Sequence, residues 1–330
     1  MHLVVYVAPS VITSRSLAST MGCKQSKHAE IEGTSVSAPD CATDQNKRVV
    51  DAGASSESYP DLSISDETWS GDDVSETLLV RFYRPLEVHL KDERLPAILD
   101  AHGGMWNKND RTLDRLTNCA LARAGYIVAA FDFRQGPNHK HPTASLDVTA
   151  ALVWLRKNSD RLKLDPNRIG LMGTSSGGHL AMYAGITPNS NQHRIGDERQ
   201  IKPPKFLMAL WPVSDPLARY RYAKRAKIER LVEAHEKYFG DEDAMREASV
   251  PRVVASGEAE SLPPLLLVHP GEDGNVPLDI TMDLIKAWQS RDGYLEYAFF
   301  PGEPHAFGLQ DSSATQRLAA LIVDFAKRHS

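Results

Sequence analysis

The sequence predicts an α/β fold in which a mostly parallel central sheet is flanked by helices. Short apolar segments alternate with segments of helical periodicity, and several of the apolar segments end at glycine or proline. The composition agrees, because 42% hydrophobic and 25% charged residues in a chain of 330 are usual for globular proteins. A chain of this length can also bury a sizeable core.

The individual elements follow from the same patterns. Strands are expected at 77–83, 95–101, 126–131, 168–172, 206–211, 265–268 and 295–300, and helices at 114–124, 145–158, 177–186, 278–291 and 314–328. Apolar strands that alternate with helices are typical of a parallel sheet covered on both faces. Ligand sites in such sheets lie at the carboxyl ends of the strands, so the residues just after each strand are the candidates for chemistry.

Residues 1–73 are expected to form a low-complexity, mostly disordered tail that precedes a catalytic domain of residues 74–330. The tail holds 13 of the 27 serines, and Tyr6 and Tyr59 are its only aromatic residues before Trp69. With so few large apolar side chains, the segment cannot offset the entropy that ordering would cost.

The tail also contains a possible membrane-targeting signal. Residues 21–26, Met-Gly-Cys-Lys-Gln-Ser, match a myristoylation signal with a cysteine for palmitoylation, provided that translation starts at Met21. The apolar residues 3–8 are too short and lack the basic flank of a signal peptide, and no apolar run predicts a transmembrane helix. We therefore expect a cytoplasmic protein, with membrane anchoring by acylation at Gly22 or Cys23 as the alternative.

Charge and metal-ligand spacing exclude several classes of partner. The 38 basic and 43 acidic residues give a net charge of −5, so no overall basic field would attract nucleic acid. The three cysteines have no spacing typical of a disulfide framework or a zinc site. His139 and His141 lack a third ligand at a useful spacing, so we expect no metal.

Ser175 is the candidate nucleophile. Residues 173–178 read Gly-Thr-Ser-Ser-Gly-Gly and match the pattern G-x-S-x-G, with Ser175 at its centre. The pattern needs a strand before it and a helix after it, and both are predicted here. Small neighbours are required because the serine sits in a strained backbone conformation on a sharp turn.

Two further strand ends carry an acid and a base. Asp273 lies in a glycine-flanked loop after the strand at 265–268, with Glu272 as its rival, and His305 follows the strand at 295–300. The order Ser175, Asp273, His305 is the order of nucleophile, acid and base in α/β-hydrolases. We therefore expect these three residues to form a catalytic triad.

A glycine pair supplies a candidate oxyanion hole. Gly103 and Gly104 follow the strand at 95–101, where two backbone N–H groups can point at one spot. Together with the N–H of Ser176 they could bind the oxygen anion of a tetrahedral intermediate.

Residues from about 75 to 328 resemble α/β-hydrolases of the hormone-sensitive-lipase and acetyl-esterase group. The resemblance is carried by four segments, 102–106 (His-Gly-Gly-Met-Trp), 173–181, 271–277 and 304–307. The same motifs are also similar to kynurenine formamidases and feruloyl-esterase-like proteins. Met105 departs from the usual third glycine of the first motif, and we expect this departure to alter the oxyanion-hole loop and to restrict bulky alcohol leaving groups.

The resemblance implies a serine hydrolase that cleaves a small or medium carboxylic ester through an acyl-enzyme on Ser175, without a cofactor. Three alternatives stay open. The first is an amidase of kynurenine-formamidase type, and the second is an acyltransferase of small-molecule, secondary-metabolite metabolism. The third is a non-catalytic small-molecule receptor, although such receptors lack a triad residue that this chain keeps.

We expect three parts of the chain to line the substrate pocket. Met105, Trp106 and Phe307 are candidate lining residues, and a helical lid insertion is expected at about 214–250. The basic stretch 219–230 within it is typical of a solvated helix face, with recognition of a substrate carboxylate as the alternative.

Overall fold

The computed structural model describes residues 3–7, 59–70, 76–86, 94–193, 195 and 200–330. The chain divides into two units, of which one comprises Val11–Tyr59 and the other Met1–Ser10 together with Pro60–Ser330. Only Tyr59 of the first unit is among the described residues, and all the other described residues belong to the second. The possible acylation signal at residues 21–26 lies outside the described residues.

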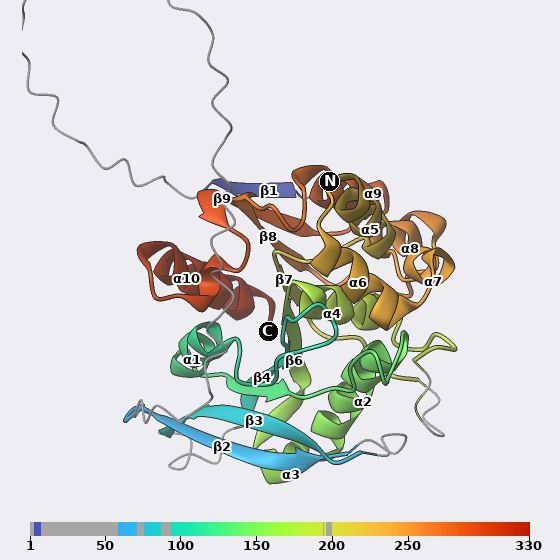
Figure 1. Ribbon diagram of the computed structural model, residues 1–330. Helices are drawn as coiled ribbons and strands as arrows, with labels where there is room; N and C mark the ends of the chain where they lie inside the picture. The colour runs from blue at the N-terminus through green and yellow to red at the C-terminus, as the bar shows by residue number, and fades with distance from the viewer. Residues whose placement is uncertain (1–2, 8–58, 71–75, 87–93, 194, 196–199) are drawn as a thin grey trace, which may run out of the picture. The chain divides into compact units, whose positions relative to one another are not determined.

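The second unit is built on one mixed sheet (Figure 1). Its nine described strands are β1 (Leu3–Val7), β2 (Leu62–Trp69), β3 (Leu78–Pro85), β4 (Leu95–Ala101), β5 (Ile127–Phe131), β6 (Leu164–Thr174), β7 (Leu207–Leu210), β8 (Leu265–Glu272) and β9 (Leu295–Pro304). Their order is β1-β9-β8-β7-β6-β4-β5-β3-β2, and the neighbouring strands are parallel except for the pairs β2–β3 and β3–β5. The predicted α/β class is confirmed.

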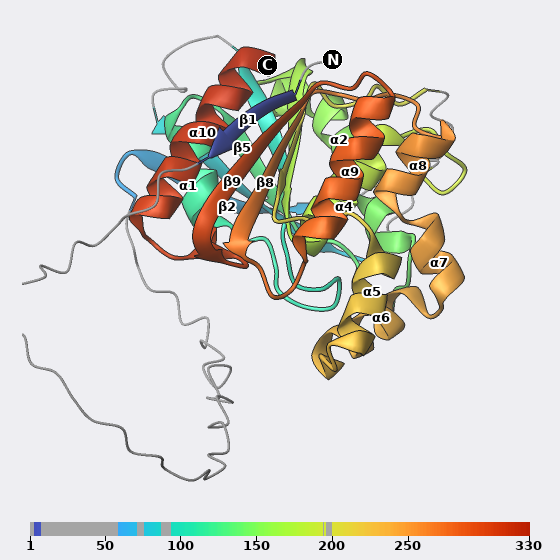
Figure 2. The ribbon, with the colours of Figure 1, turned by 90° about the horizontal axis from the view of Figure 1, so that it is seen from above.

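Helices cover both faces of the sheet. Outside the segment between β7 and β8 they are α1 (Arg115–Arg123), α2 (Thr143–Lys157), α3 (Ser159–Leu162), α4 (Ser176–Ile186), α9 (Leu278–Ser290), the short 3-10 helix η2 (Phe307–Leu309) and α10 (Ser313–His329). α1 packs against α10 on one face, and α2, α4 and α9 lie on the other (Figure 2). The strands between them are buried on both faces, which is why their sequences are continuously apolar.

The insertion between β7 and β8 is helical. It contains α5 (Pro216–Arg225), α6 (Glu229–Phe239), α7 (Glu242–Glu247) and α8 (Val250–Ser256), so its helices extend six residues beyond the expected end at 250. The side chains of Asp215, Asp241 and Ser249 cap the first turns of α5, α7 and α8. Gly257 ends α8 with a positive φ of 83°, which favours glycine.

The folded unit begins earlier than the expected boundary at residue 74. β2 pairs with β3 along its whole length, and Trp69 is buried with its ring 5.7 Å from that of Phe131. Between its buried ends, Leu62 and Trp69, this edge strand alternates partly buried with exposed residues, and most of them are polar. Its serines and acidic residues therefore gave it the composition of a tail, and the expectation of tail up to residue 73 was wrong there.

A second correction concerns the first residues of the chain. β1 pairs in parallel with β9, from Leu3 opposite Leu295 to Val7 opposite Phe299. The described side chains of β1, those of residues 4–7, are exposed. Backbone pairing with β9 brings this strand into the sheet, and the short apolar run alone did not reveal that partner. The expectation of disorder for residues 8–58 falls outside the described residues.

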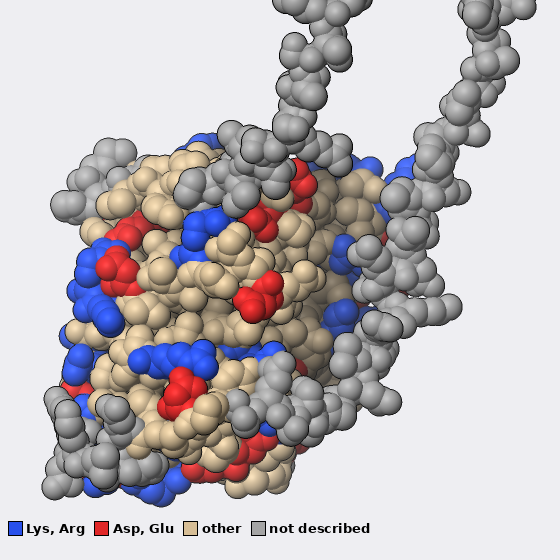
Figure 3. Space-filling model, turned by 90° about the vertical axis from the view of Figure 1, so that its left-hand side faces the viewer, with Lys and Arg blue, Asp and Glu red and all other residues tan. Residues whose placement is uncertain are grey.

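Three further features of the described residues concern surface charge, the character of the helices and one thiol. Basic and acidic side chains are interspersed on the face shown in Figure 3. None of the helices in the described part of the chain combines the length with the apolar character that a membrane span requires. Cys119 is a buried free thiol, in keeping with its place in α1.

Candidate active site

Ser175 occupies a strained turn between β6 and α4. Its backbone has φ 50° and ψ −115°, a conformation that residues with a side chain rarely adopt. A Cβ on Gly177 would lie 1.9 Å from the carbonyl oxygen of Ala101, so only glycine fits beside this turn. The pattern G-x-S-x-G thus has its expected place between a strand and a helix.

Ser175, His305 and Asp273 form one hydrogen-bonded chain. The Oγ of Ser175 lies 2.9 Å from Nε2 of His305, and Nδ1 of His305 lies 2.7 Å from Oδ2 of Asp273. A carboxylate only accepts hydrogen bonds, so Nδ1 carries the proton and Nε2 has a free lone pair toward Ser175. This is the tautomer that can take a proton from the serine hydroxyl.

The Asp273 carboxylate is fixed by its own loop. Its Oδ1 accepts hydrogen bonds from the backbone N–H groups of Asn275, at 2.8 Å, and Val276, at 2.9 Å. The side chain is only 1% exposed, whereas Glu272 is exposed to solvent. The structure thus brings Asp273 to His305, while its rival Glu272 faces water.

The loop after β4 runs beside Ser175. A Cβ on Gly103 would lie 3.4 Å from Cβ of Ser175, and Gly104 has a φ of +136°. Asn109 holds the loop through a hydrogen bond from its Nδ2 to the carbonyl oxygen of Gly103, at 3.3 Å. Among the hydrogen bonds of the described turns and loops, none uses the N–H of Gly103, Gly104 or Ser176 as donor. None of the three N–H groups thus has a backbone acceptor there, as binding of an anionic oxygen would require.

Adding a methyl group to Gly104 should damage this loop. A Cβ there would lie 1.9 Å from the carbonyl oxygen of Lys108, on a backbone whose φ already disfavours side chains. We expect Gly104→Ala to lower kcat for an activated ester by about 10²–10³, the usual effect of losing one oxyanion donor. The measurement is ester hydrolysis with the melting temperature in parallel. A folded Gly104→Ala variant with wild-type kcat would contradict the proposed place of Gly104.

The comparisons with known proteins agree with this geometry. A family model described as BD-FAE matches residues 83–288, more than half of the chain. The chain belongs to the BD-FAE family. This family member is 26% identical to the esterase LipC of Mycobacterium tuberculosis, over 70% of its own length and 57% of LipC. It is also 33% identical to the carboxylesterase NlhH of the same organism over 126 residues, 38% of each chain.

Solved structures share the fold. Carboxyl esterase 2 of the mycorrhizal fungus Tuber melanosporum superposes with a TM-score of 0.68 at 18% identity, covering 83% of this chain and 89% of that one. EstE1, a thermostable carboxylesterase from a metagenomic library, gives a TM-score of 0.65 at 24% identity, covering 81% and 90%. The resemblance to α/β-hydrolase esterases is confirmed. The chain matches a little over half the length of its curated relatives LipC and LipM.

Of the three expected pocket residues, Trp106 is buried, and it packs against helix α6 of the insertion. It is 1% exposed, and its ring is stacked on that of Tyr238 at a centroid distance of 5.5 Å. Its Nε1 donates a hydrogen bond to Nδ1 of His179, at 3.3 Å. Trp106 thus connects the loop after β4 to α4 and α6. Its side chain has little exposed surface that a substrate could contact.

The other two expected pocket residues differ in burial. Met105 is half-buried, with a positive φ of 57°. Phe307 is buried and packs against Phe300 and Trp211, with ring centroids 4.8 and 5.1 Å away. Phe307 therefore supports the loop that carries His305, and Met105 is the more accessible of the pair.

His102 holds the loop after β4 in place through a hydrogen bond and a ring contact. It is buried, its ring is stacked on that of Phe133 at 4.3 Å, and its Nδ1 donates to the carbonyl oxygen of Gly103 at 2.8 Å. Burial lowers the pKa of His102, so the ring stays neutral and keeps its proton on Nδ1. Among the described residues no three His, Cys, Asp or Glu side chains gather as a metal site would require.

Two buried carboxyl groups beneath the site escaped the sequence analysis. Oδ2 of Asp100 accepts a hydrogen bond from Asn118, at 2.7 Å, and Oδ2 of Asp114 accepts one from Thr174, at 3.0 Å. Burial raises the pKa of Asp100 to about 7 and, helped by the charge of Asp100, raises that of Asp114 well above its usual range. Single aspartates within a strand and before a helix carry no sequence signal of this pairing.

This raised pKa predicts a pH-dependent stability. Between about pH 4 and pH 7 the folded chain keeps the Asp100 proton that the unfolded chain has released, so stability falls by about 1.4 kcal/mol per pH unit. Asp100→Asn removes this loss, since an amide oxygen can still accept from Asn118. We expect the free energy of unfolding of Asp100→Asn, relative to wild type, to rise from pH 4 to pH 7 in urea titrations.

The exposed Asp292 supplies the control for this prediction. Asp292→Asn should shift the free energy of unfolding by the same small amount at every pH. A difference between Asp100→Asn and wild type that did not change with pH would contradict the prediction.

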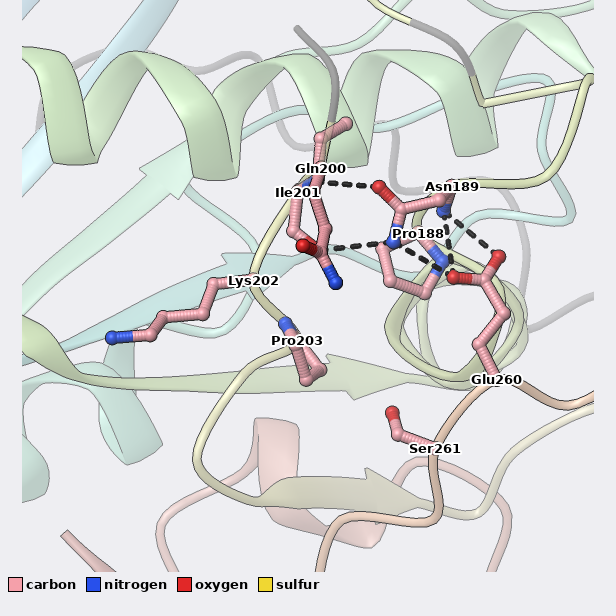
Figure 4. A pocket seen from close by; sticks show the side chains of 8 residues that line it. All are labelled: Pro188, Asn189, Gln200, Ile201, Lys202, Pro203, Glu260 and Ser261. Carbon is pink, nitrogen blue, oxygen red and sulfur yellow. Dashed lines mark hydrogen bonds between the residues drawn. The ribbon is translucent and has the colours of Figure 1, made fainter.

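A pocket of 540 Å³ lies near the amino ends of the central strands β7 and β8 (Figure 4). Most of its lining residues come just before β7 (200–203) or just before β8 (260–261). The pocket therefore lies at the amino ends of these strands, whereas Ser175 and His305 lie at the carboxyl ends. The side chain of Asn189 crosses it, donating to Glu260 at 2.7 Å and to the carbonyl oxygen of Ile201 at 3.1 Å. This pocket is thus separate from the candidate active site.

Proposed function

We propose that the protein is a serine hydrolase that cleaves a small or medium carboxylic ester through an acyl-enzyme. The observation that carries this proposal is the continuous hydrogen-bonded chain from Ser175 Oγ through His305 to Asp273. The esterase names of LipC and NlhH support the same reaction class.

In the acylation step, Oγ of Ser175 attacks the carbonyl carbon of the ester while Nε2 of His305 takes the hydroxyl proton. The Asp273 carboxylate holds the ring by its Nδ1–H and stabilises the imidazolium. The imidazolium then gives its proton to the alkoxide leaving group, which departs as an alcohol. The acyl group stays on Ser175.

The tetrahedral oxyanion of this step is bound by backbone N–H groups. Gly103 and Gly104 supply two, and Ser176 supplies the third from the first turn of α4. The positive end of the helix dipole at this position adds to the stabilisation. All three donors are held by the fold before the reaction, so little reorganisation is needed when the charge develops.

In the deacylation step, water takes the place of the alcohol. His305 removes a proton from the water molecule, whose oxygen attacks the acyl carbon. The second tetrahedral intermediate collapses, the proton returns to Oγ of Ser175, and a carboxylic acid leaves. The cycle needs no cofactor.

Covalent trapping tests this proposal. The purified protein should hydrolyse p-nitrophenyl acetate with saturation kinetics, and a fluorophosphonate should stop this activity at a stoichiometry of one. Mass spectrometry of a digest should place the adduct on the peptide that contains Ser175. Labelling of another residue would overturn the assignment of the nucleophile, and absence of both turnover and labelling would overturn the proposed reaction.

The compartment remains a prediction. We propose the cytoplasm, with acylation at Gly22 or Cys23 as the alternative for a chain started at Met21. Mass spectrometry of the N-terminal peptide from the native source distinguishes the two, because a myristoylated Gly22 requires the later start.

A further inference from the structure

The basic stretch of the insertion contains one buried cation. Segment 219–230 has six basic residues, and Arg219 alone is buried, with 1% of its surface exposed. The other five are exposed: Arg221, Lys224, Arg225, Lys227 and Arg230. A solvated helix face therefore explains five of the six residues and leaves Arg219 unexplained.

Two uncharged rings hold the Arg219 guanidinium in place. Its Nε donates a hydrogen bond to Nε2 of His235, at 3.3 Å, and Nδ1 of His235 donates to the carbonyl oxygen of Leu231, at 2.6 Å. His235 is thus a neutral acceptor, in line with its pKa, which burial lowers well below the usual range. The guanidinium carbon lies 5.2 Å from the ring centre of Trp106, a cation–π distance.

No carboxylate in the described part of the chain forms an ion pair with Arg219, although the more distant charge of Asp273 favours its charged form. Nη2 of Arg219 is buried without a hydrogen-bond partner. The nearby acids are engaged elsewhere: Asp215 accepts from Ala218 and Ser249, and Glu236 accepts from Tyr220. Burial lowers the pKa of Arg219 to about 9, so the group is still charged at neutral pH.

Arg219 interacts with both loops that carry candidate catalytic groups. Trp106, which faces its guanidinium, is two residues after Gly104, and the charge of Asp273 also acts on Arg219. α5 also touches the loop after Asp273, where the hydroxyl of Tyr222 donates to the carbonyl oxygen of Gly274 at 3.0 Å. These same two loops carry the proposed oxyanion donors Gly103 and Gly104 and the proposed acid Asp273.

We propose that Arg219 binds a carboxylate group of the substrate. An unpaired buried charge is costly, and a bound anion would supply the missing counter-ion through charge-assisted hydrogen bonds to the Nη atoms. Nε is occupied by His235, so the free Nη2 end of the fork receives the anion. The inference rests on the proposed function and narrows it to esters that carry a carboxylate in either their acyl or their alcohol part.

Matched pairs of esters test the inference. 4-Nitrophenyl hemisuccinate carries an acyl-side carboxylate that 4-nitrophenyl 4-methylpentanoate replaces by an isopropyl group of the same shape. 4-Acetoxybenzoate and 4-acetoxybenzamide form the pair for the alcohol side. We expect Arg219→Met to raise KM about 10- to 100-fold for the charged member of one pair, with kcat nearly unchanged. The neutral member should stay within about threefold of wild type.

Controls separate binding from structure. Arg225→Met, at an exposed position of the same helix, should leave all four esters unchanged, and Arg219→Lys should restore part of the lost affinity. Equal losses for charged and neutral esters in Arg219→Met would overturn the inference in favour of a structural role, as would an unchanged KM or a wild type that rejects both charged esters. A wild type without any Ser175-dependent activity would instead overturn the proposed function.

A measurement on the wild type covers the case in which Arg219→Met does not fold. Free succinate or 4-hydroxybenzoate should inhibit hydrolysis of a neutral ester competitively, whereas succinamide and 4-hydroxybenzamide should inhibit it far less. Equal inhibition by the acids and the amides would overturn the inference without any variant.

Discussion

Replacing Ser175 by alanine is expected to lower kcat/KM for p-nitrophenyl acetate by about 10⁴- to 10⁶-fold. The variant keeps the oxyanion N–H groups and the histidine, so only the covalent route is lost. His305 could still activate water against a bound ester, and binding with the oxyanion donors would leave a small rate above that in water. The measurement is initial rate against substrate concentration, with the melting temperature as a test of folding.

Ser261→Ala is the matched control for the Ser175 variant. Ser261 lies in the pocket at the amino ends of the strands, away from His305 (Figure 4). We expect this variant to keep the wild-type rate within about twofold. A rate that survived in Ser175→Ala would show that hydrolysis does not pass through this serine.

Replacing Asp273 by asparagine should lower kcat by about 10⁴-fold. The backbone N–H groups of Asn275 and Val276 point at Oδ1, so the amide oxygen of an asparagine would take that position. Its NH₂ group must then face Nδ1 of His305 and donate to it. This forces the histidine proton onto Nε2, where it opposes the serine hydroxyl and blocks proton transfer.

Glu272→Gln controls for the loss of a negative charge in the same loop. Glu272 is exposed and directly precedes Asp273 in the sequence. We expect it to retain activity within about twofold, with the pH–rate profile unchanged. If Glu272→Gln lost more activity than Asp273→Asn, the acid of the triad would have been assigned to the wrong residue.

The triad could be predicted from sequence because each member follows a strand and has a local signature. Ser175 needs small neighbours on its turn, and Asp273 and His305 follow apolar runs that are buried on both faces of the sheet. Chain order then linked three separate strand ends. Their distances needed the structure, because register and loop path are set by packing across the whole sheet.

Features that depend on distant partners could not be predicted. β2 has a polar alternating sequence that indicates an edge strand only once β3 is beside it. The pKa of Asp114 is raised by burial and by the charge of Asp100, a buried neighbour fourteen positions away. Arg219 belongs to a helix whose other cations face water, so its burial became visible only when Trp106 and His235 were placed around it.

Because β1 pairs with β9, the residue at which translation starts determines whether the sheet includes β1. A chain begun at Met21 would lack Leu3–Val7, and the backbone of β9, the strand that leads to His305, would then form an open edge able to pair with another strand. Acylation at Gly22 requires that shorter chain. Acylation of Gly22 and the presence of strand β1 therefore exclude each other, so the choice of initiation site would decide both whether this anchor can form and whether the edge of β9 is covered.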